Sequence, residues 1–256
     1  MQRRGRATGR TADVSPMQLT LWSARDDSAG WNVRISRRAR RLSMRVFPGG
    51  RVEVVVPPGI GVPAVERFVA RHRDWAERRS RELALHAPST AERRPRHIEL
   101  ALTGRHWGVE YEVARRSHVR DLGDGVLRVG LASDDEREIG AVLLQWLTSV
   151  AGMHLTVSLA SLARQLGIDY TQLQLRRQRT RWGSCSSAGA ISLNVCLMFQ
   201  RDPVVRYLMT HELCHRRHMN HSRRFWGLVE RFEPDWRALD AELLKGWRNV
   251  PAWVFP

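Results

Sequence analysis

The residues whose types and spacing point most directly to chemistry are His211, Glu212 and His215, which form a His-Glu-x-x-His motif. Residues at positions i and i+4 of a helix lie one above the other, so both imidazoles can face one metal ion. Glu212 would project beside them, where its carboxylate can take a proton from a metal-bound water. The motif therefore predicts a zinc ion held by His211 and His215, with Glu212 as the general base.

A catalytic zinc site needs a third protein ligand and one open position. His221 lies six residues after His215, and Asn220 before it can adopt the left-handed conformation that ends a helix. His218 would lie on the same helix face, but about 4.5 Å further along the axis than His215. A carboxylate from the next helices would instead give a His-His-Glu site, and the candidates are Glu230, Glu233 and Glu242. We expect His221 to be the third ligand, with the other residues as alternatives.

The spacing of the three histidines equals that of the metzincin peptidases, H-E-x-x-H-x-x-G-x-x-H. Two features oppose membership of that class. His218 stands where those proteins have glycine, and no methionine follows Met219 to form their methionine turn. A different group of zinc peptidases is therefore required.

Four segments, taken in order along the chain, carry a resemblance to a known family. They are R-T-R-W-G-S-C-S at 179–186, G-A-I-S-L-N at 189–194, H-E-L-C-H at 211–215 and N-H-S-R-R-F-W at 220–226. Together they resemble the YgjP-like predicted metal-dependent hydrolases, which are related to SprT-like proteases. Segments 37–57 and 68–75 also look like this family, so the resemblance covers about residues 31–250. It implies a zincin-type catalytic domain in which His211, His215 and His221 bind zinc and Glu212 is the base.

The residues around the R-T-R-W-G-S-C-S segment allow two interpretations. Gly183 permits a tight backbone, and the strand expected at 190–194 could lie at the rim of the metal cleft and pair with an extended substrate. Alternatively, Trp182, Leu193 and Asn194 only join strand to helix. Cys185 and Ser184 lack an ordered base partner, so a structural role is favoured over nucleophilic catalysis. The spacing of Phe225 and Trp226 with Leu228, Val229 and Phe232 favours helix core over substrate contact.

Changes in periodicity along the chain predict three regions. Residues 1–30 are expected to form a mobile basic tail. Residues 31–133 are expected to form a small β-rich region with one helix, in which segments 31–35, 42–46 and 52–56 make an antiparallel meander. Within it, a helix is predicted at 62–85, a linker at 87–96, and strands at 107–113 and 126–131 that complete the sheet.

Residues 134–256 are expected to form the zincin-like metallopeptidase domain, mainly helical with a short sheet. A long helix should have the acidic segment 134–138 as its first turn and end near Gly167. Strands are predicted at 173–177 and 190–195, and three helices at 204–219, 222–232 and 236–247. The fold class is therefore α+β.

The long helix lacks charged residues from Ile139 to Ala163, which is enough to span a bilayer. Its polar and small residues nevertheless recur on one helical stripe, namely Gln145, Thr148, Ser149, Gly152 and Thr156. This stripe predicts a partly exposed core helix, and we expect no contact with a membrane.

The composition of the 256-residue chain indicates one or two folded domains. The net charge is +16, but 43% of the residues are hydrophobic, which excludes wholesale disorder. Three cysteines without metal-type spacing and an N-terminus without an apolar signal region predict a cytoplasmic protein. Arginines cluster at 37–41 and 176–181, where they could bind nucleic acid non-specifically.

The resulting hypothesis is a zinc-dependent metallopeptidase that hydrolyses peptide bonds through a zinc-activated water, with Glu212 as general base and a protein or peptide as substrate. Arg181, Tyr207 and His218 are candidate donors to the oxyanion. One alternative is a nucleic-acid-associated protease acting on DNA-bound protein. The other is a non-catalytic module in which zinc only holds the helices together. The sequence leaves the oligomeric state open.

Overall fold

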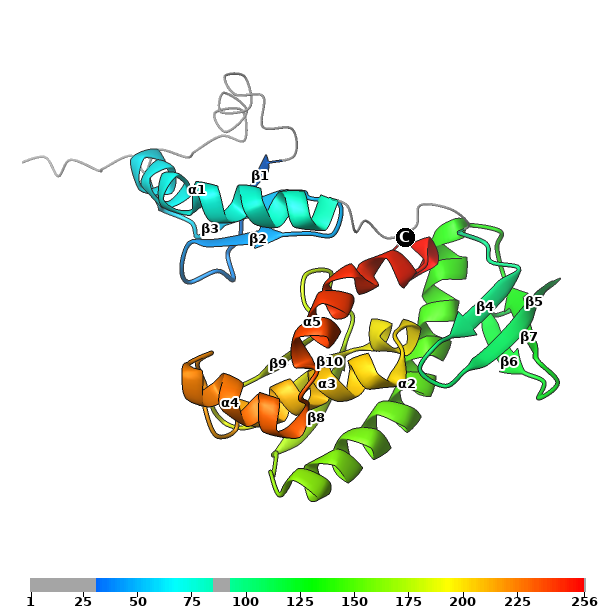
Figure 1. Cartoon of the computed structure of the whole chain (residues 1–256). Coiled ribbons are helices and arrows are strands. Elements are labelled where there is room, and N and C mark those ends of the chain that lie inside the picture. The colour runs from blue at the N-terminus through cyan, green and yellow to red at the C-terminus, as the bar shows by residue number, and fades with distance from the viewer. Residues whose placement is uncertain (1–30, 85–92, 256) are drawn as a thin grey trace, which may run out of the picture. The chain divides into compact units, whose positions relative to one another are not determined.

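The structure is a computed structural model that describes residues 31–84 and 93–255. The predicted tail at 1–30 and positions 87–92 of the predicted linker lie outside the described residues. Contacts divide the described chain into two compact units. The first comprises residues 31–45 and 51–77, and the second comprises residues 46–50, 78–84 and 93–255. Helices and three small sheets together give the predicted α+β fold (Figure 1).

The first sheet consists of β1 (Trp31–Ile35), β2 (Ser43–Val46) and β3 (Val52–Val56), followed by helix α1 (Val62–Ala84). The strand order is β1-β3-β2, and β1 pairs with β3 in parallel. The predicted antiparallel meander is therefore wrong, because β3 inserts beside β1 instead of following β2 at the edge. A small core forms where Val54 and Val56 meet Val65 and Val69 of α1.

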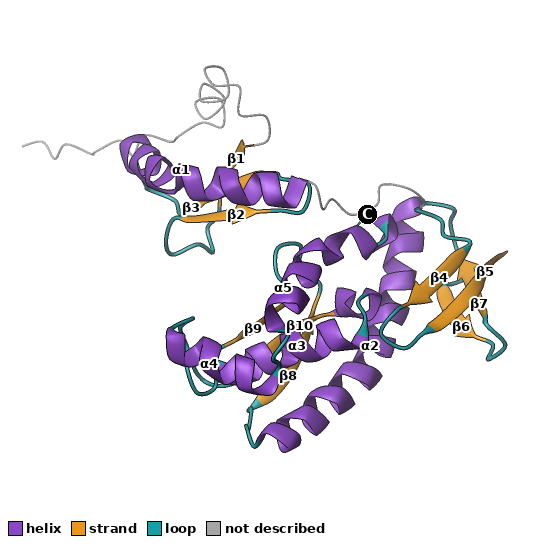
Figure 2. Cartoon of the chain, viewed as in Figure 1, coloured by secondary structure: helices purple, strands orange, loops and turns teal. Residues whose placement is uncertain are grey.

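The second sheet lies in the second unit and has four strands (Figure 2). These are β4 (His97–Leu100), β5 (Arg105–Val113), β6 (His118–Asp121) and β7 (Val126–Leu131), in the order β4-β5-β7-β6. The expectation that the strands at 107–113 and 126–131 complete the N-terminal sheet is wrong, since none of these four strands pairs with β1, β2 or β3. The buried Trp107 instead packs edge-on against Trp146 of the long helix.

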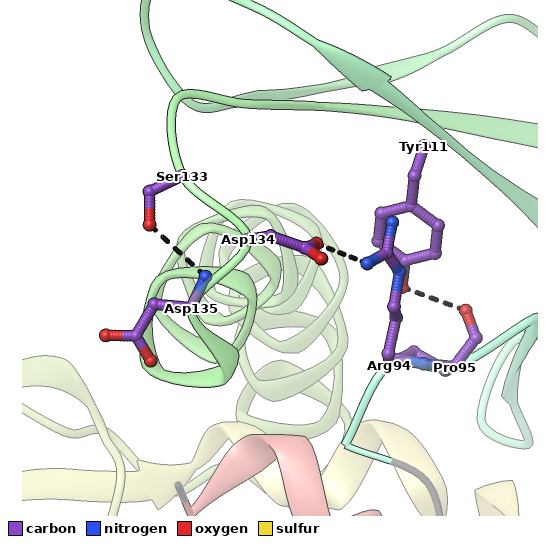
Figure 3. A network of polar contacts seen from close by, with 6 residues as sticks. All are labelled: Arg94, Pro95, Tyr111, Ser133, Asp134 and Asp135. Atoms are coloured by element: carbon purple, nitrogen blue, oxygen red, sulfur yellow. Dashed lines mark hydrogen bonds and ion pairs between the residues drawn. The ribbon is translucent and has the colours of Figure 1, made fainter.

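A polar network joins the start of this sheet region to the beginning of the long helix (Figure 3). The guanidinium of Arg94 lies 4.4 Å from the centre of the Tyr111 ring and forms an ion pair with Asp134. The Tyr111 hydroxyl donates to the carbonyl oxygen of Pro95 over 2.9 Å. The network fixes the segment that enters β4 against the N-terminus of the helix.

The long helix α2 (Glu136–Leu166) begins and ends where its capping residues predict. Asp135 accepts a hydrogen bond from the amide of Arg137, and Gly167 closes the helix in the left-handed conformation. By length and composition alone α2 could cross a membrane. However, residues such as Leu143, Leu147, Leu155 and Leu159 form a buried stripe, and α2 contacts α3, β6 and β8. The predicted polar stripe is exposed except at Gly152, which is half-buried.

The third sheet and the C-terminal helices carry the candidate site. The strands are β8 (Gln172–Arg176), β9 (Gly183–Cys185) and β10 (Ala190–Asn194), followed by the short 3₁₀ helix η3 (Val195–Phe199). The helices are α3 (Asp202–Cys214), α4 (Arg223–Phe232) and α5 (Trp236–Lys245), with short 3₁₀ turns at Gly246–Asn249 and Ala252–Val254. Helix α3 contacts α2, α4, α5 and β9, so it lies at the centre of this assembly (Figure 1).

Candidate metal centre and active site

Helix α3 carries His211 and Glu212 in its last turn, and His215 is the residue that caps its C-terminus. Pro203 lies at its first turn, where a missing amide hydrogen costs nothing, and Val204, Val205, Leu208 and Met209 are buried. The helix was predicted to continue to residue 219, but it ends at Cys214. The chain turns at once after His215, because the segment 216–222 must return to bring His221 back to the helix.

The three predicted ligands converge at the end of this helix. One ligand atom from each of His211, His215 and His221 lies within 4.8 Å of the others. The Nε2 atoms of His211 and His221 are 3.1 Å apart. Such close approach of three imidazoles with no acidic side chain among them suits a shared cation. The donor set therefore fits a zinc site of three histidines with one open position.

The imidazole of His215 is oriented by the backbone. Its Nδ1 atom lies 3.1 Å from the carbonyl oxygen of His218. A carbonyl oxygen can only accept, so Nδ1 carries the proton and Nε2 keeps its lone pair for a metal ion. Burial lowers the pKa of His215, and it lowers that of His211 to about 3. Both rings are therefore neutral at pH 7, which is the form that binds metal.

Aromatic rings surround the histidines on the α4 side. Phe225 is fully buried, and its ring centre lies 4.5 to 4.9 Å from the centres of all three imidazoles. The ring of Trp226 stacks on His221 with centres 5.5 Å apart, and the ring of Trp236 stacks on Trp226 with centres 4.1 Å apart. Ser222 caps α4 by accepting a hydrogen bond from the amide of Phe225, at the start predicted for this helix. The cap and the rings fix the loop residue His221, which is otherwise exposed.

Glu212 follows His211 in α3, and its buried side chain lies against β9. A Cβ atom placed on Gly183 would lie 2.7 Å from Glu212 Oε1 and 3.0 Å from its Cγ. Oε2 of Glu212 is buried with no hydrogen-bond partner among the described residues. Burial raises the pKa of Glu212 to about 8, although Arg181 lowers it. Such an orphaned carboxylate is suited to exchanging a proton with a reactant.

The alternative third ligands are engaged elsewhere. Glu230 pairs with Arg237 at 2.8 Å, and Glu242 pairs with Arg201 at 2.6 Å. Glu233 accepts a hydrogen bond from the hydroxyl of Thr210 and pairs with Arg206, each through Oε1. The His218 side chain is not in the described histidine cluster, and its carbonyl oxygen serves His215. Of the candidate third ligands, only His221 lies with His211 and His215.

The R-T-R-W-G-S-C-S segment is held from β10. The amide nitrogen of the buried Asn194 side chain donates to the carbonyl oxygens of Gln178 at 2.7 Å and Arg181 at 2.9 Å. Its Oδ1 accepts from the amide of Cys196. Trp182 is buried and stacks on Trp247 at 4.1 Å. These contacts support the interpretation of Trp182 and Asn194 as residues that build the fold around the site.

The strand next to the histidines is β9, not β10. The sheet order is β8-β10-β9, so both edges of β10 are already paired and it cannot add a substrate strand. The amide of Asn194 donates to Trp182, and the amide of Ser186 donates to Ala190. Because antiparallel pairs alternate, the backbone groups of Gly183 and Cys185 face away from β10. The open edge beside Glu212 therefore belongs to β9.

The remaining candidates have distinct environments. Tyr207 is buried, and its hydroxyl donates to Asp240 at 2.8 Å, so it is not free to donate to an oxyanion. Arg181 is exposed and interacts electrostatically with Glu212. Cys185 lies in β9, and burial raises the pKa of its thiol. A neutral thiol is a poor nucleophile, in agreement with a structural role.

Two spatial relationships at the site were not predicted from the sequence. The contact of Gly183 with Glu212 joins positions far apart in the chain, and the glycine in a tight segment was its only local signal. Trp226 was interpreted as helix core, yet it is half-buried and faces His221. Its position one residue after the buried Phe225 was the signal that could have placed it at the rim.

Comparisons with known proteins bear on the family of this chain. A family model described as YgjP-like, metallopeptidase domain, matches residues 40–245. Among solved structures, the chain is similar to the metallopeptidase zymogen abylysin of Pyrococcus abyssi, with 24% sequence identity and a TM-score of 0.33. That alignment covers 37% of this chain and 97% of the other. No curated protein matches the chain. Since the family match spans most of the sequence, including every residue of the histidine cluster, this chain belongs to the YgjP-like metallopeptidase family.

Proposed function

We propose that this protein is a cytoplasmic zinc-dependent peptidase. The observation that carries the proposal is the convergence of His211, His215 and His221 at the end of α3, the helix that also carries the buried, unpartnered carboxylate of Glu212. A structural zinc site is normally closed by four protein ligands, whereas a catalytic one has three and an open position. The three-histidine cluster with an adjacent base favours catalysis over a non-catalytic zinc module.

In this proposal His211, His215 and His221 hold the zinc ion. When bound, zinc supplies Lewis acidity, which polarises a carbonyl group and makes water a better nucleophile. Glu212 accepts the proton of the attacking water and delivers it to the leaving amine. The Oε2 atom of Glu212 has no hydrogen-bond partner among the described residues, so it is available to the reacting water. Arg181, which interacts electrostatically with Glu212, is the candidate donor to the oxyanion.

The edge of β9 that does not pair with β10 favours a substrate in an extended conformation. An extended peptide can hydrogen-bond to the backbone groups of Gly183 and Cys185, which face away from β10. Gly183 also touches Glu212, so a peptide on this edge passes close to the base. We therefore propose that the substrate is an unfolded or extended protein segment.

Metal reconstitution tests the proposed function. Chelator-treated protein should lose cleavage of an unfolded protein such as reduced casein, and one equivalent of zinc should restore it. Cleavage that persists at full chelation, or a fully zinc-loaded protein that cleaves no member of a diverse peptide library, would contradict a zinc peptidase.

Association with nucleic acid is a second candidate, supported by the first unit. Arg37, Arg38, Arg40 and Arg41 in the loop after β1 are exposed and have no ion-pair partner among the described residues. Such a cluster can neutralise phosphates without sequence preference. The affinity for a mixed-sequence duplex should fall steeply with salt if this holds. Absence of binding at low salt would remove the candidate.

A further inference from the structure

The sequence that builds the site is strongly basic. Residues 170–229 contain only two acidic residues, Asp202 and Glu212. The same stretch contains ten arginines, at positions 176, 177, 179, 181, 201, 206, 216, 217, 223 and 224. Asp202 begins α3, whereas Glu212 lies at its other end. Glu212 is therefore the one carboxylate that this stretch places at the histidine cluster.

Most of these arginines are held by other parts of the fold. Arg201 and Arg206 pair with Glu242 and Glu233. Arg177, Arg216 and Arg217 donate to backbone carbonyl oxygens, Arg176 donates to Gln174, and Arg179 lies over the Phe255 ring.

Three exposed arginines remain whose side chains have no hydrogen bond or ion pair in the described part of the chain: Arg181, Arg223 and Arg224. All three flank the site. Arg181 comes two residues before Gly183 and interacts electrostatically with Glu212. Arg223 and Arg224 are the first two residues of α4, after the cap Ser222, and lie two and three residues after His221 in the chain. Side chains of one sign around a reaction centre concentrate ligands of the opposite sign.

We propose that Arg181, supported by Arg223 and Arg224, selects peptide substrates with acidic side chains near the scissile bond. The inference rests on the proposed peptidase function and names its substrate class.

Arg181 is the best placed of the three to act as a specific anchor. Its backbone carbonyl is fixed by Asn194, and the next residue, Trp182, is buried against Trp247. The Arg181 side chain thus extends from a fixed backbone, and its guanidinium can bind a carboxylate through two parallel hydrogen bonds. Arg181 lies two residues before Gly183, which lies against Glu212. A peptide paired along Gly183 and Cys185 would therefore meet Arg181 at one end of this edge, so the preference should fall on one side of the cleaved bond.

Binding to the zinc-loaded Glu212→Gln variant tests the inference without turnover. The probes are fluorescein-labelled octapeptides of Gly, Ala and Ser that carry two Asp, two Gln or two Lys at the centre. We expect the Asp peptide to bind about 3- to 10-fold more tightly than the Gln peptide, the range of one to two accessible ion pairs. The preference should shrink in 1 M NaCl, where the screening length is about 3 Å.

Arginine variants in the same background give the specific control. Arg181→Gln should remove most of the preference, and Arg181→Glu should reverse it toward the Lys peptide. Arg115→Gln changes the net charge equally, but Arg115 is an exposed residue of the loop between β5 and β6, so it should change nothing. Zinc content measured for each variant reports whether the site is intact.

The outcomes separate the inference from the function on which it rests. Wild-type cleavage of all three peptides at equal rates, with equal binding, would overturn the acidic preference and leave the peptidase function standing. Selective binding of the Asp peptide that is lost in Arg181→Gln, without cleavage by the wild type, would support the anchor and contradict the peptidase. Equal loss of preference in Arg115→Gln would also overturn the assignment to Arg181.

Discussion

Gly183 and Glu212 are in contact across the site, and the contact leaves no room for a side chain at position 183. A Cβ atom there would lie 2.7 Å from Oε1 of the Glu212 carboxylate. Gly183 of β9 thus lies against Glu212, and its own backbone groups face away from β10.

Replacing Gly183 by alanine should therefore displace the Glu212 carboxylate. We expect peptidase activity to fall by about 10²-fold, the scale of a misplacement of about 1 Å at a reacting group. Zinc content should not change, because Glu212 is not a ligand in this account. Gly227→Ala on α4 is the matched control, since a Cβ there meets nothing within 4 Å. Unchanged activity in Gly183→Ala would show that the contact does not position the base.

Removal of single ligands should distinguish a three-histidine site from a His-His-Glu site. His211→Ala, His215→Ala and His221→Ala should each weaken zinc binding more than the 10- to 100-fold that is usual for loss of an outer residue. Glu230→Gln and Glu233→Gln should retain zinc, because their carboxylates pair with Arg237 and Arg206. A competition titration with a chelator measures each affinity. A larger loss in Glu233→Gln than in His221→Ala would reassign the third ligand.

Trp226 should act as a positioning residue for the exposed ligand His221. Its ring stacks on the imidazole at 5.5 Å and rests on Trp236. Trp226→Leu should lower zinc affinity about 10-fold and shift the visible absorption of the cobalt-substituted protein. Trp75→Leu, at a tryptophan in the first unit that is 45% exposed, is the control. An unaltered cobalt spectrum in Trp226→Leu would mean that the stack does not hold the ligand.

Cys185 should be dispensable for catalysis. Burial and the nearby Glu212 raise the pKa of its thiol, so the unreactive neutral form prevails at pH 7. Cys185→Ser should keep activity within about twofold, and iodoacetamide should modify Cys185 more slowly than a free cysteine. Rapid alkylation at pH 7 together with loss of activity would indicate a nucleophilic role.

Local signals in the sequence located the helices well. The acidic segment 134–138 and Gly167 mark the two ends of α2, and the predicted start at residue 222 lies at the cap of α4, because such end signals depend on residues within one turn of the helix. The spacing of His211 and His215 likewise predicts their common face. The end of α3 at Cys214 was missed, since the return of the chain to His221 is a tertiary requirement.

Strand pairing could not be predicted in the same way. The parallel pairing of β1 with β3 and the central place of β10 depend on which edges other segments occupy. A period of two identifies a strand but not its neighbours. The contact between Gly183 and Glu212 follows from that pairing, so the sequence could name both residues without placing them together.

The most direct test of the account compares wild-type protein with Glu212→Gln at equal zinc occupancy. Glutamine keeps the size of the side chain but cannot accept a proton from water. Hydrolysis of a diverse peptide library is followed by mass spectrometry, with zinc content and melting temperature measured on the same samples. We predict that the variant keeps its zinc and its stability while the rate falls by about 10²-fold or more. Equal hydrolysis by the two proteins would contradict the assignment of Glu212 as the base.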